Sequence, residues 1–301
     1  NSILCDGEDK GGMDTGKNIT CYSHIHDDHM NYRGLSDRLA VGPVYCSKET
    51  KKLASALHKE SIDVINDRKN FHGLDWSDKE TIQINGEKIE ISFKKCNHIL
   101  GSSAILFKNL TKDKSVLYSS DFASLKGTHV EENVDVLVLD ATHGEHSLNQ
   151  EFLDISEGKK EIIKKVKEII KEAEESSQRP RMNIHAHRGT MQKVMYWLRG
   201  ELDESIKFVA SKMDANLARV YSESGNECGK IEDEEEVIDD YFANNKAFIH
   251  FIPWSNMSTA CETISPIVPQ IRIGSVTNTT TVSPTQMYTI NLKEHAAIEE
   301  I

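Results

Sequence analysis

The chain has 301 residues, of which 38% are hydrophobic and 28% are charged, enough for one large or two medium globular domains with a sizeable core. No apolar run reaches the roughly 18 residues of a membrane span, and no charged-then-apolar leader opens the sequence. The formal net charge of −12 argues against non-specific binding to a polyanion, although acid-rich segments such as 232–236 leave room for a basic surface elsewhere.

Six cysteines are widely spaced, without a C-x-x-C pair or the dense framework of small secreted domains. We expect them to be reduced and mostly buried. Together with the composition, they predict a soluble intracellular protein, cytoplasmic or nuclear, that has no membrane partner.

The opening stretch, residues 1–7, predicts a strand that ends in Asp6, after which glycines and Asp14 favour turns. A second strand-like run, 18–23, leads directly into a short segment rich in histidine and aspartate. Taken alone, Asp6 can simply cap a turn.

Residues 24–29 read His-Ile-His-Asp-Asp-His. Imidazoles and carboxylates packed this closely desolvate one another unless a cation lies between them, so the segment indicates a metal site. In an extended segment His24 and His26 point to one side and can hold one ion, while Asp28 and His29 turn towards a second. The alternative is a His-rich surface loop that binds metal only adventitiously.

Nitrogen and oxygen ligands of this kind suit zinc best, with manganese or iron as weaker candidates. A pair of such ions acidifies a water molecule and stabilises both the attacking and the leaving oxygen of a displacement. We therefore expect one or two Zn²⁺ ions, with Mn²⁺ as the substitute.

The next elements are a short strand at 44–46, a helix at 49–57 and a hairpin over 81–93 that alternates with period two around an Asn-Gly pair. His58 and His72 lie in polar sequence between them. We expect both histidines at the surface and neither as a ligand.

Two further candidate ligands follow strands. Residues 95–107 predict two strands joined by a loop that carries His98, and the run 115–122 is an apolar strand that leads to Asp121. A carboxylate at this position can bridge two ions, because it offers two oxygens and screens the repulsion between the metals.

The pattern His-x-His-x-Asp-His, followed at a distance by His98 and Asp121, resembles the metal-binding motif of the metallo-β-lactamase superfamily. This resemblance implies an αββα sandwich of α/β class and a role for Asp6 in orienting the metal loop. The metal ligands that it implies are His24, His26, Asp28, His29, His98 and Asp121, with Asp28 also counted as catalytic.

A narrower resemblance lies further along the chain. The predicted strand 134–140 ends in Asp140, and small-Thr-His-Gly follows, which is similar to the first extra motif of the β-CASP branch, whose members cut nucleic acids. The strand 287–292 leads to His295, similar to the second motif. There the histidine assists proton transfer at the leaving group and the acidic residue supports it, so the resemblance implies catalytic roles for His295 and Asp140.

Between these motifs the pattern alternates between helix and strand. A charged amphipathic helix covers 151–176, and strands are predicted at 182–186, 206–211 and 247–253, with helices after the first two. Such alternation predicts an inserted α/β domain.

The loop after the first of these strands contains a Gly-x-x-Gln sequence that in β-CASP proteins opens a helix facing the site. His187, Arg188 and Gly189 are therefore the expected substrate contacts. His185 and His187 could also bind metal, but we favour polar contacts to substrate.

The expected domains are a metallo-β-lactamase domain at 1–144, a β-CASP insertion at 145–287 and a return to the first domain at 288–301. The third β-CASP motif would lie beyond Ile301, so we expect the chain to be truncated there.

The resemblance implies a metal-dependent nuclease that hydrolyses phosphodiester bonds by a two-metal hydroxide mechanism. Asn97 beside His98, and Asp140, favour Artemis-type DNA nucleases slightly, although Leu100 replaces the proline of that loop and ribonuclease J also has aspartate at the position of Asp140.

The alternatives are an RNA-processing ribonuclease, a small-molecule hydrolase of thioesters, lactams or lactones, and a non-catalytic scaffold. Expected partners are DNA or RNA, and a homo-oligomer or a repair or processing complex.

Overall fold

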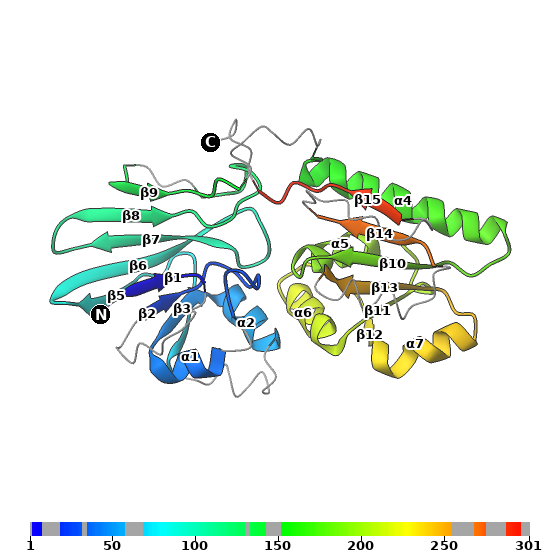
Figure 1. The fold of residues 1–301 in the computed structure, drawn as a ribbon, viewed down its shortest axis with the longest axis horizontal. Helices are drawn as coiled ribbons and strands as arrows, with labels where there is room; N and C mark the ends of the chain where they lie inside the picture. Colours follow the sequence, from blue (N-terminus) through cyan, green and yellow to red (C-terminus); the bar gives the residue numbers. More distant parts are fainter. Residues whose placement is uncertain are drawn as a thin grey trace. The chain divides into compact units, whose positions relative to one another are not determined.

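The structure, a computed structural model, describes residues 2–7, 19–31, 35–57, 69–129, 133–142, 152–254, 268–274 and 287–295. The chain divides into two compact α/β units, each with its own sheets and helices (Figure 1). The first unit comprises Asn1–His146 with Glu294–Ile301, and the second comprises Ser147–Lys293.

One sheet of the first unit is parallel, with the strand order β1-β2-β3-β4. Helix α2 packs against β3 and β4 and buries Leu53, Ala54 and Leu57, the apolar face that the sequence predicted. The bounds are Ile3–Cys5 for β1, Ile19–Cys21 for β2, Leu35–Val41 for α1, Val44–Ser47 for β3, Lys48–Leu57 for α2 and Phe71–Leu74 for β4.

The other sheet of this unit is mixed, in the order β5-β6-β7-β8-β9. The predicted hairpin is confirmed: β5 and β6 pair antiparallel, and both turn residues lie in the left-handed region, at φ 52° for Asn85 and 84° for Gly86. The bounds are Glu80–Ile84 for β5, Glu87–Lys95 for β6, Ser103–Asn109 for β7, Lys114–Tyr118 for β8 and Val136–Val138 for β9.

The two sheets share a core. Residues of β2 and β3 form one buried cluster with residues of β6 and β7: Ile19, Cys21, Tyr45, Ile91, Phe93 and Ile105. The unit therefore has a helix layer and two facing sheets, as expected of the sandwich. The fourth layer of an αββα sandwich is not found among the described residues, and the side chains of β9 are about half exposed, Leu137 at 51%.

The second unit is built on a parallel sheet in the order β12-β11-β13-β10-β14-β15. Helix α5 contacts both α4 and α6, and helix α7 contacts strands β11 and β12. The bounds are Ile155–Glu175 for α4, Arg181–Ala186 for β10, Thr190–Arg199 for α5, Lys207–Ala210 for β11, Lys212–Glu223 for α6, Ile231–Asp233 for β12, Glu234–Ala243 for α7, Phe248–Pro253 for β13, Gln270–Ile273 for β14 and Met287–Ile290 for β15.

Helix α4 begins where its sequence predicts. The side chain of Asp154 accepts a hydrogen bond from the Glu157 amide and so caps the first turn. The predicted apolar stripe buries Ile162, Val166 and Ile169. No helix in the described part of the chain is long and apolar enough to span a membrane.

Several expectations need correction. His72 is not a surface residue: it lies in β4, half-buried, and its ring stacks on Tyr45 at 4.6 Å because the strand brings the two side by side. His58 lies outside the described residues. Strand β15 pairs with β14 in the second unit, so the chain returns to the first unit at Glu294, later than the expected residue 288.

Candidate metal centre

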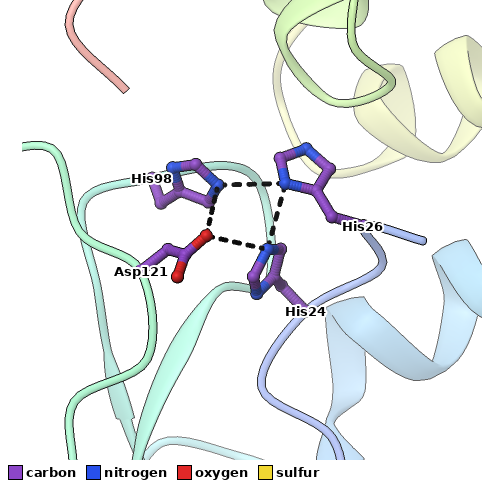
Figure 2. A group of neighbouring side chains, drawn as sticks. All are labelled: His24, His26, His98 and Asp121. Atoms are coloured by element: carbon purple, nitrogen blue, oxygen red, sulfur yellow. Dashed lines mark hydrogen bonds and ion pairs between the residues drawn. The ribbon is translucent and has the colours of Figure 1, made fainter. Parts of the chain in front are cut away.

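Four side chains of the first unit converge on one point (Figure 2). His24 and His26 come from the loop after β2, His98 from the loop between β6 and β7, and Asp121 from the segment after β8. Each offers one ligand atom, and these atoms all lie within 4.8 Å of one another. Sequence segments almost a hundred residues apart therefore supply one group of metal-type ligands.

Four of the six distances between the ligand atoms are near those around a tetrahedral ion, and the other two are within 4.8 Å. His26 Nδ1 lies 3.0 Å from His24 Nε2 and 3.2 Å from His98 Nε2. Asp121 Oδ2 lies 3.7 Å from His24 Nε2 and 3.8 Å from His98 Nε2. Ligands 2.0–2.1 Å from a tetrahedral zinc stand about 3.3–3.4 Å apart, so the observed edges bracket that value.

The hydrogen bonds around His24 aim a lone pair at this point. The Ser23 hydroxyl donates to Asp6, so its oxygen accepts from His24 Nδ1 at 2.9 Å and from the Ser120 hydroxyl at 2.6 Å. Burial, and then the neighbouring imidazoles, hold the pKa of His24 well below its usual range. A neutral ring with its proton on Nδ1 presents an unprotonated Nε2, which is the form that binds metal.

His98 is held in the same manner. Its Nδ1 donates to the carbonyl oxygen of Glu294 at 2.9 Å, which leaves Nε2 directed at His26 and Asp121. A backbone carbonyl on the far nitrogen is the usual orienting partner of a metal-binding histidine. The return of the chain at Glu294 thus positions a ligand that lies 196 residues earlier in the sequence.

The turn after His98 requires glycine. Gly101 has φ +80°, and a Cβ at this position would lie 2.6 Å from both the amide nitrogen and the hydroxyl of Thr50. The Gly101 carbonyl accepts hydrogen bonds from the hydroxyls of Ser47 and Thr50. These contacts fix the loop that carries His98 against the start of helix α2.

Asp6 is buried and accepts several hydrogen bonds that hold the metal loop, residues 24–29, in place. Its carboxylate accepts hydrogen bonds from the Ser23 amide and hydroxyl, from Tyr118 at 3.0 Å and from His29 Nδ1 at 2.9 Å. Its backbone has φ 51°, a left-handed conformation whose cost is offset by these contacts. The geometry agrees with an orienting role and not with a simple turn cap.

We expect Asp6→Asn to weaken metal binding by about 10- to 100-fold, the usual loss when a residue that orients metal ligands is changed. Asparagine retains the shape but replaces one accepting oxygen by an NH₂ group. Competition with a chromogenic chelator measures the affinity. Asp27→Asn, an exposed residue of the same loop, is the matched control, and equal affinities for the two variants would contradict the role of Asp6.

The residues predicted for a second ion are only partly assembled. His29 Nε2 lies 3.2 Å from Asp121 Oδ2. Burial lowers the pKa of His29, but its hydrogen bonds to Asp121 and Asp6 outweigh burial and raise the pKa to about 10. Asp28 is 80% exposed in its side chain and lies 3.8 Å from His29, outside the four-ligand group. Its ligand and catalytic roles stay predictions.

A second group adjoins Asp121. His295 Nδ1 lies 3.0 Å from Asp140 Oδ2 and 3.8 Å from Asp121 Oδ2. Thr142 donates to Asp140 Oδ1 from its amide and its hydroxyl. Burial raises the pKa of Asp140, but the hydrogen bonds from His295 and Thr142 outweigh it and lower the pKa to about 2. Burial lowers the pKa of His295, but its hydrogen bond to Asp140 and the nearby charge of Asp121 outweigh burial and raise the pKa.

The substrate contacts expected in the second unit have structural partners. Arg188 Nε donates to the buried carboxylate of Asp214 at 2.8 Å, and the Gly189 amide donates to the side chain of Gln192. His187 is exposed. His185 is fully buried in β10, and its Nε2 donates to Gln270 Oε1 at 2.6 Å; it belongs to neither group of metal-type ligands found among the described residues. Substrate binding by residues 187–189 stays a prediction.

Sequence reasoning missed the hydroxyls that connect these residues. Ser23 and Tyr118 donate to the Asp6 carboxylate, Ser120 donates to the Ser23 hydroxyl, and Thr142 donates to Asp140. Only Thr142 carried a local signal, because it follows Asp140 by two residues. Tyr118 and Ser120 act through contacts between distant segments, which no sequence spacing displays, and Ser23, although adjacent to His24, is connected to Asp6 only by the fold.

Comparison with known proteins gives distant similarity. No family model matches the chain. The DNA cross-link repair protein SNM1 of Arabidopsis thaliana is 33% identical over 126 residues, 40% of this chain, and the match spans only 23% of that protein's length. The metallo-beta-lactamase fold protein YhfI from Bacillus subtilis aligns over 40% of this chain and 47% of its own, at 16% identity and a TM-score of 0.26.

Proposed function

We propose that this chain, which has a metallo-β-lactamase-like α/β fold and is distantly related to SNM1 over 40% of its length, is a metal-dependent nuclease of the β-CASP branch. Its second unit would be the β-CASP insertion. The substrate is a phosphodiester bond of nucleic acid, with DNA favoured over RNA.

The observation that carries this proposal is the hydrogen-bonded pair of His295 and Asp140 next to Asp121. Cleavage of a phosphodiester expels an alkoxide, which leaves readily only when it receives a proton. An imidazole held by a carboxylate beside the metal-type ligands can supply that proton. A thioester expels a thiolate, which needs no such donor, so the pair favours the phosphodiesterase over a thioesterase; the assay below decides between a phosphodiesterase and a hydrolase of lactams or lactones.

The other residues of the site would bind the metal ions and orient the proton donor. His24, His26, His98 and Asp121 would hold one ion, and His29 with Asp28 would complete a second position next to Asp121. Zinc, when bound, supplies Lewis-acid stabilisation of developing charge and an acidified water. Asp140 keeps the His295 imidazole protonated and oriented, because its own pKa is low and its other oxygen is fixed by Thr142.

DNA is favoured over RNA for two reasons. The matched curated relative is by its name a DNA cross-link repair protein. In addition, Asn97 precedes His98 as in Artemis-type nucleases, and its side chain donates to Ser124 and to the Lys126 carbonyl, which fixes the turn that follows Asp121.

Metal analysis and hydrolysis assays test the proposal. We expect the purified protein to carry one or two zinc ions and to cleave labelled single-stranded DNA after reconstitution with zinc or manganese. Chelated protein is the control. A folded protein that takes up no transition metal contradicts the metal centre. Turnover of thioesters or lactones without cleavage of DNA or RNA contradicts the nuclease, and faster cleavage of RNA reverses the preference.

A further inference from the structure

Arg272 is a buried cation without a counter-charge in the described part of the chain. It lies in β14 with 6% of its surface exposed, and its Nε has no hydrogen-bond partner. Burial lowers its pKa. By contrast, Arg188 pairs with Asp214, and Arg181 donates to backbone carbonyls. An unpaired buried guanidinium is costly, so a fold that keeps one points to an anion supplied from outside.

The neighbours of Arg272 on the sheet are polar as well. In the register of the parallel strands, Arg272 of β14 lies beside His185 of β10. Two residues earlier in β10, Asn183 lies between His250 of β13 and Gln270 of β14. These side chains share one face of the sheet, because strand residues alternate between faces. Asn183 Oδ1, His185 Nδ1 and His250 Nδ1 are also buried without a partner, but the amide oxygen only accepts, and so does Nδ1 of a neutral ring whose Nε2 donates, so among these unpartnered atoms Arg272 Nε is the one that can donate to an anion.

A stack of planar groups connects this buried cation with solvent. The Arg272 guanidinium lies over the ring of Trp254, with Cζ 3.8 Å from the ring centroid. The Trp254 ring is stacked on His187, with centroids 5.2 Å apart and an interplanar angle of 4°. His187 and Trp254 follow directly after β10 and β13, so the stack lies at the carboxyl ends of adjacent parallel strands, where α/β sheets commonly bind ligands.

We propose that Arg272, Trp254 and His187 form a nucleotide subsite in the second unit, in which Arg272 binds a phosphate of a single strand and a base stacks on the His187–Trp254 pair. The subsite deepens the proposed nuclease function and rests on it. Its two halves match the two chemical parts of a nucleotide, since arginine forms charge-assisted hydrogen bonds to phosphate and aromatic rings accept any base. It adds a contact that sequence reasoning did not assign to Arg272 or Trp254.

Binding measurements on the full chain test the subsite independently of catalysis. The probe is a fluorescein-labelled single-stranded oligonucleotide, as DNA and as RNA, titrated by anisotropy with chelator present so that no hydrolysis occurs. We expect Arg272→Met to weaken binding about tenfold or more and to lower the slope of log affinity against log salt by about 0.7, as for one lost phosphate contact.

Modified probes separate the two halves of the subsite. An oligonucleotide with a neutral methylphosphonate backbone should bind wild type and Arg272→Met equally. His187→Ala should weaken binding of the normal strand about fivefold or more but leave an abasic strand unaffected. Arg272→Lys keeps the charge and should retain part of the affinity. Arg181→Met is the matched control, because Arg181 also lies over aromatic rings, at the opposite end of the same sheet.

Each outcome has one meaning. If wild type binds and cleaves nucleic acid but Arg272→Met and His187→Ala bind as Arg181→Met does, the subsite is wrong and the nuclease proposal stands. If the variants lose binding as described while no cleavage occurs under any metal, the subsite stands and the nuclease is wrong. If Arg272→Met does not fold, the abasic probe with His187→Ala decides. Absence of any binding by wild type overturns the subsite, and the cleavage assay with metal then decides the nuclease.

Discussion

Replacing Asp121 by asparagine is expected to lower phosphodiester hydrolysis by about 10³-fold or more. Asp121 belongs to both ligand groups of the centre, and its Oδ2 lies within 3.8 Å of four histidines. Losing its charge removes the one anionic ligand of the four-residue group and weakens ion binding. Metal-ion catalysis contributes several kcal/mol of transition-state stabilisation, and each 1.36 kcal/mol is a factor of ten in rate.

Initial rates on labelled DNA and the metal content of the same preparation measure this effect. Asp113→Asn is a matched control, because Asp113 is an exposed aspartate in the turn before β8 and asparagine tolerates its φ of 51°. Circular dichroism shows whether the fold is retained. Full activity with full metal content in Asp121→Asn would mean that the four-ligand group is not the catalytic centre.

The His295→Ala variant is expected to lose about 10²- to 10⁴-fold in the rate of the chemical step, the range for a lost general acid, while its metal content is unchanged. The reason is geometric: His295 Nδ1 bonds to the Asp140 carboxylate, which holds the imidazole 3.8 Å from Asp121 and raises its pKa, as the proposed acid requires. A nitrophenyl phosphodiester has a leaving group that needs no proton. The variant should therefore recover much of its rate on this substrate.

The control for His295→Ala is Asp140→Asn, which keeps the histidine but removes the carboxylate that holds it. It should show a smaller loss with the same dependence on the leaving group. A different result is equally informative, because Asp121, Asp140 and His295 form a second group of metal-type ligands. If His295→Ala loses a metal ion, or slows the activated substrate as much as DNA, His295 is a ligand and not the acid.

The group of candidate ligands His24, His26, His98 and Asp121 could be predicted from the sequence, because such ligands leave a local signature, whereas Asp28, predicted with them, lies outside the group. His24 and His26 are two residues apart, and each remaining ligand follows an apolar strand, which places it at a sheet edge. The hairpin around Asn85-Gly86 was predictable for a similar reason, since both residues tolerate left-handed backbone. In these segments the local pattern and the tertiary structure agree.

Other features depend on contacts that no short pattern contains. No element was predicted for the acidic run at 232–236, but its first two residues end β12 and the other three begin α7, where Asp233 caps the helix and the acidic first turn suits the helix dipole. The orienting role of Asp6 depends on Tyr118, which lies 112 residues away. Arg272 has no periodic neighbours to mark it, because β14 has only four residues.

The hydrogen bond from His98 to the Glu294 carbonyl makes metal occupancy and the docking of the returning chain thermodynamically reciprocal. If docking of residues 294–295 raises the affinity of the site for the ion, because it orients the His98 ring, then bound ion favours the docked position of residues 294–295 by the same factor. An ion at a free concentration one hundred times its dissociation constant would contribute up to about 2.7 kcal/mol to this closure. On the proposed assignments, metal depletion would weaken the docking of residues 294–295 by the same factor, so the ligand His98 and the proposed acid His295 would lose their positions together.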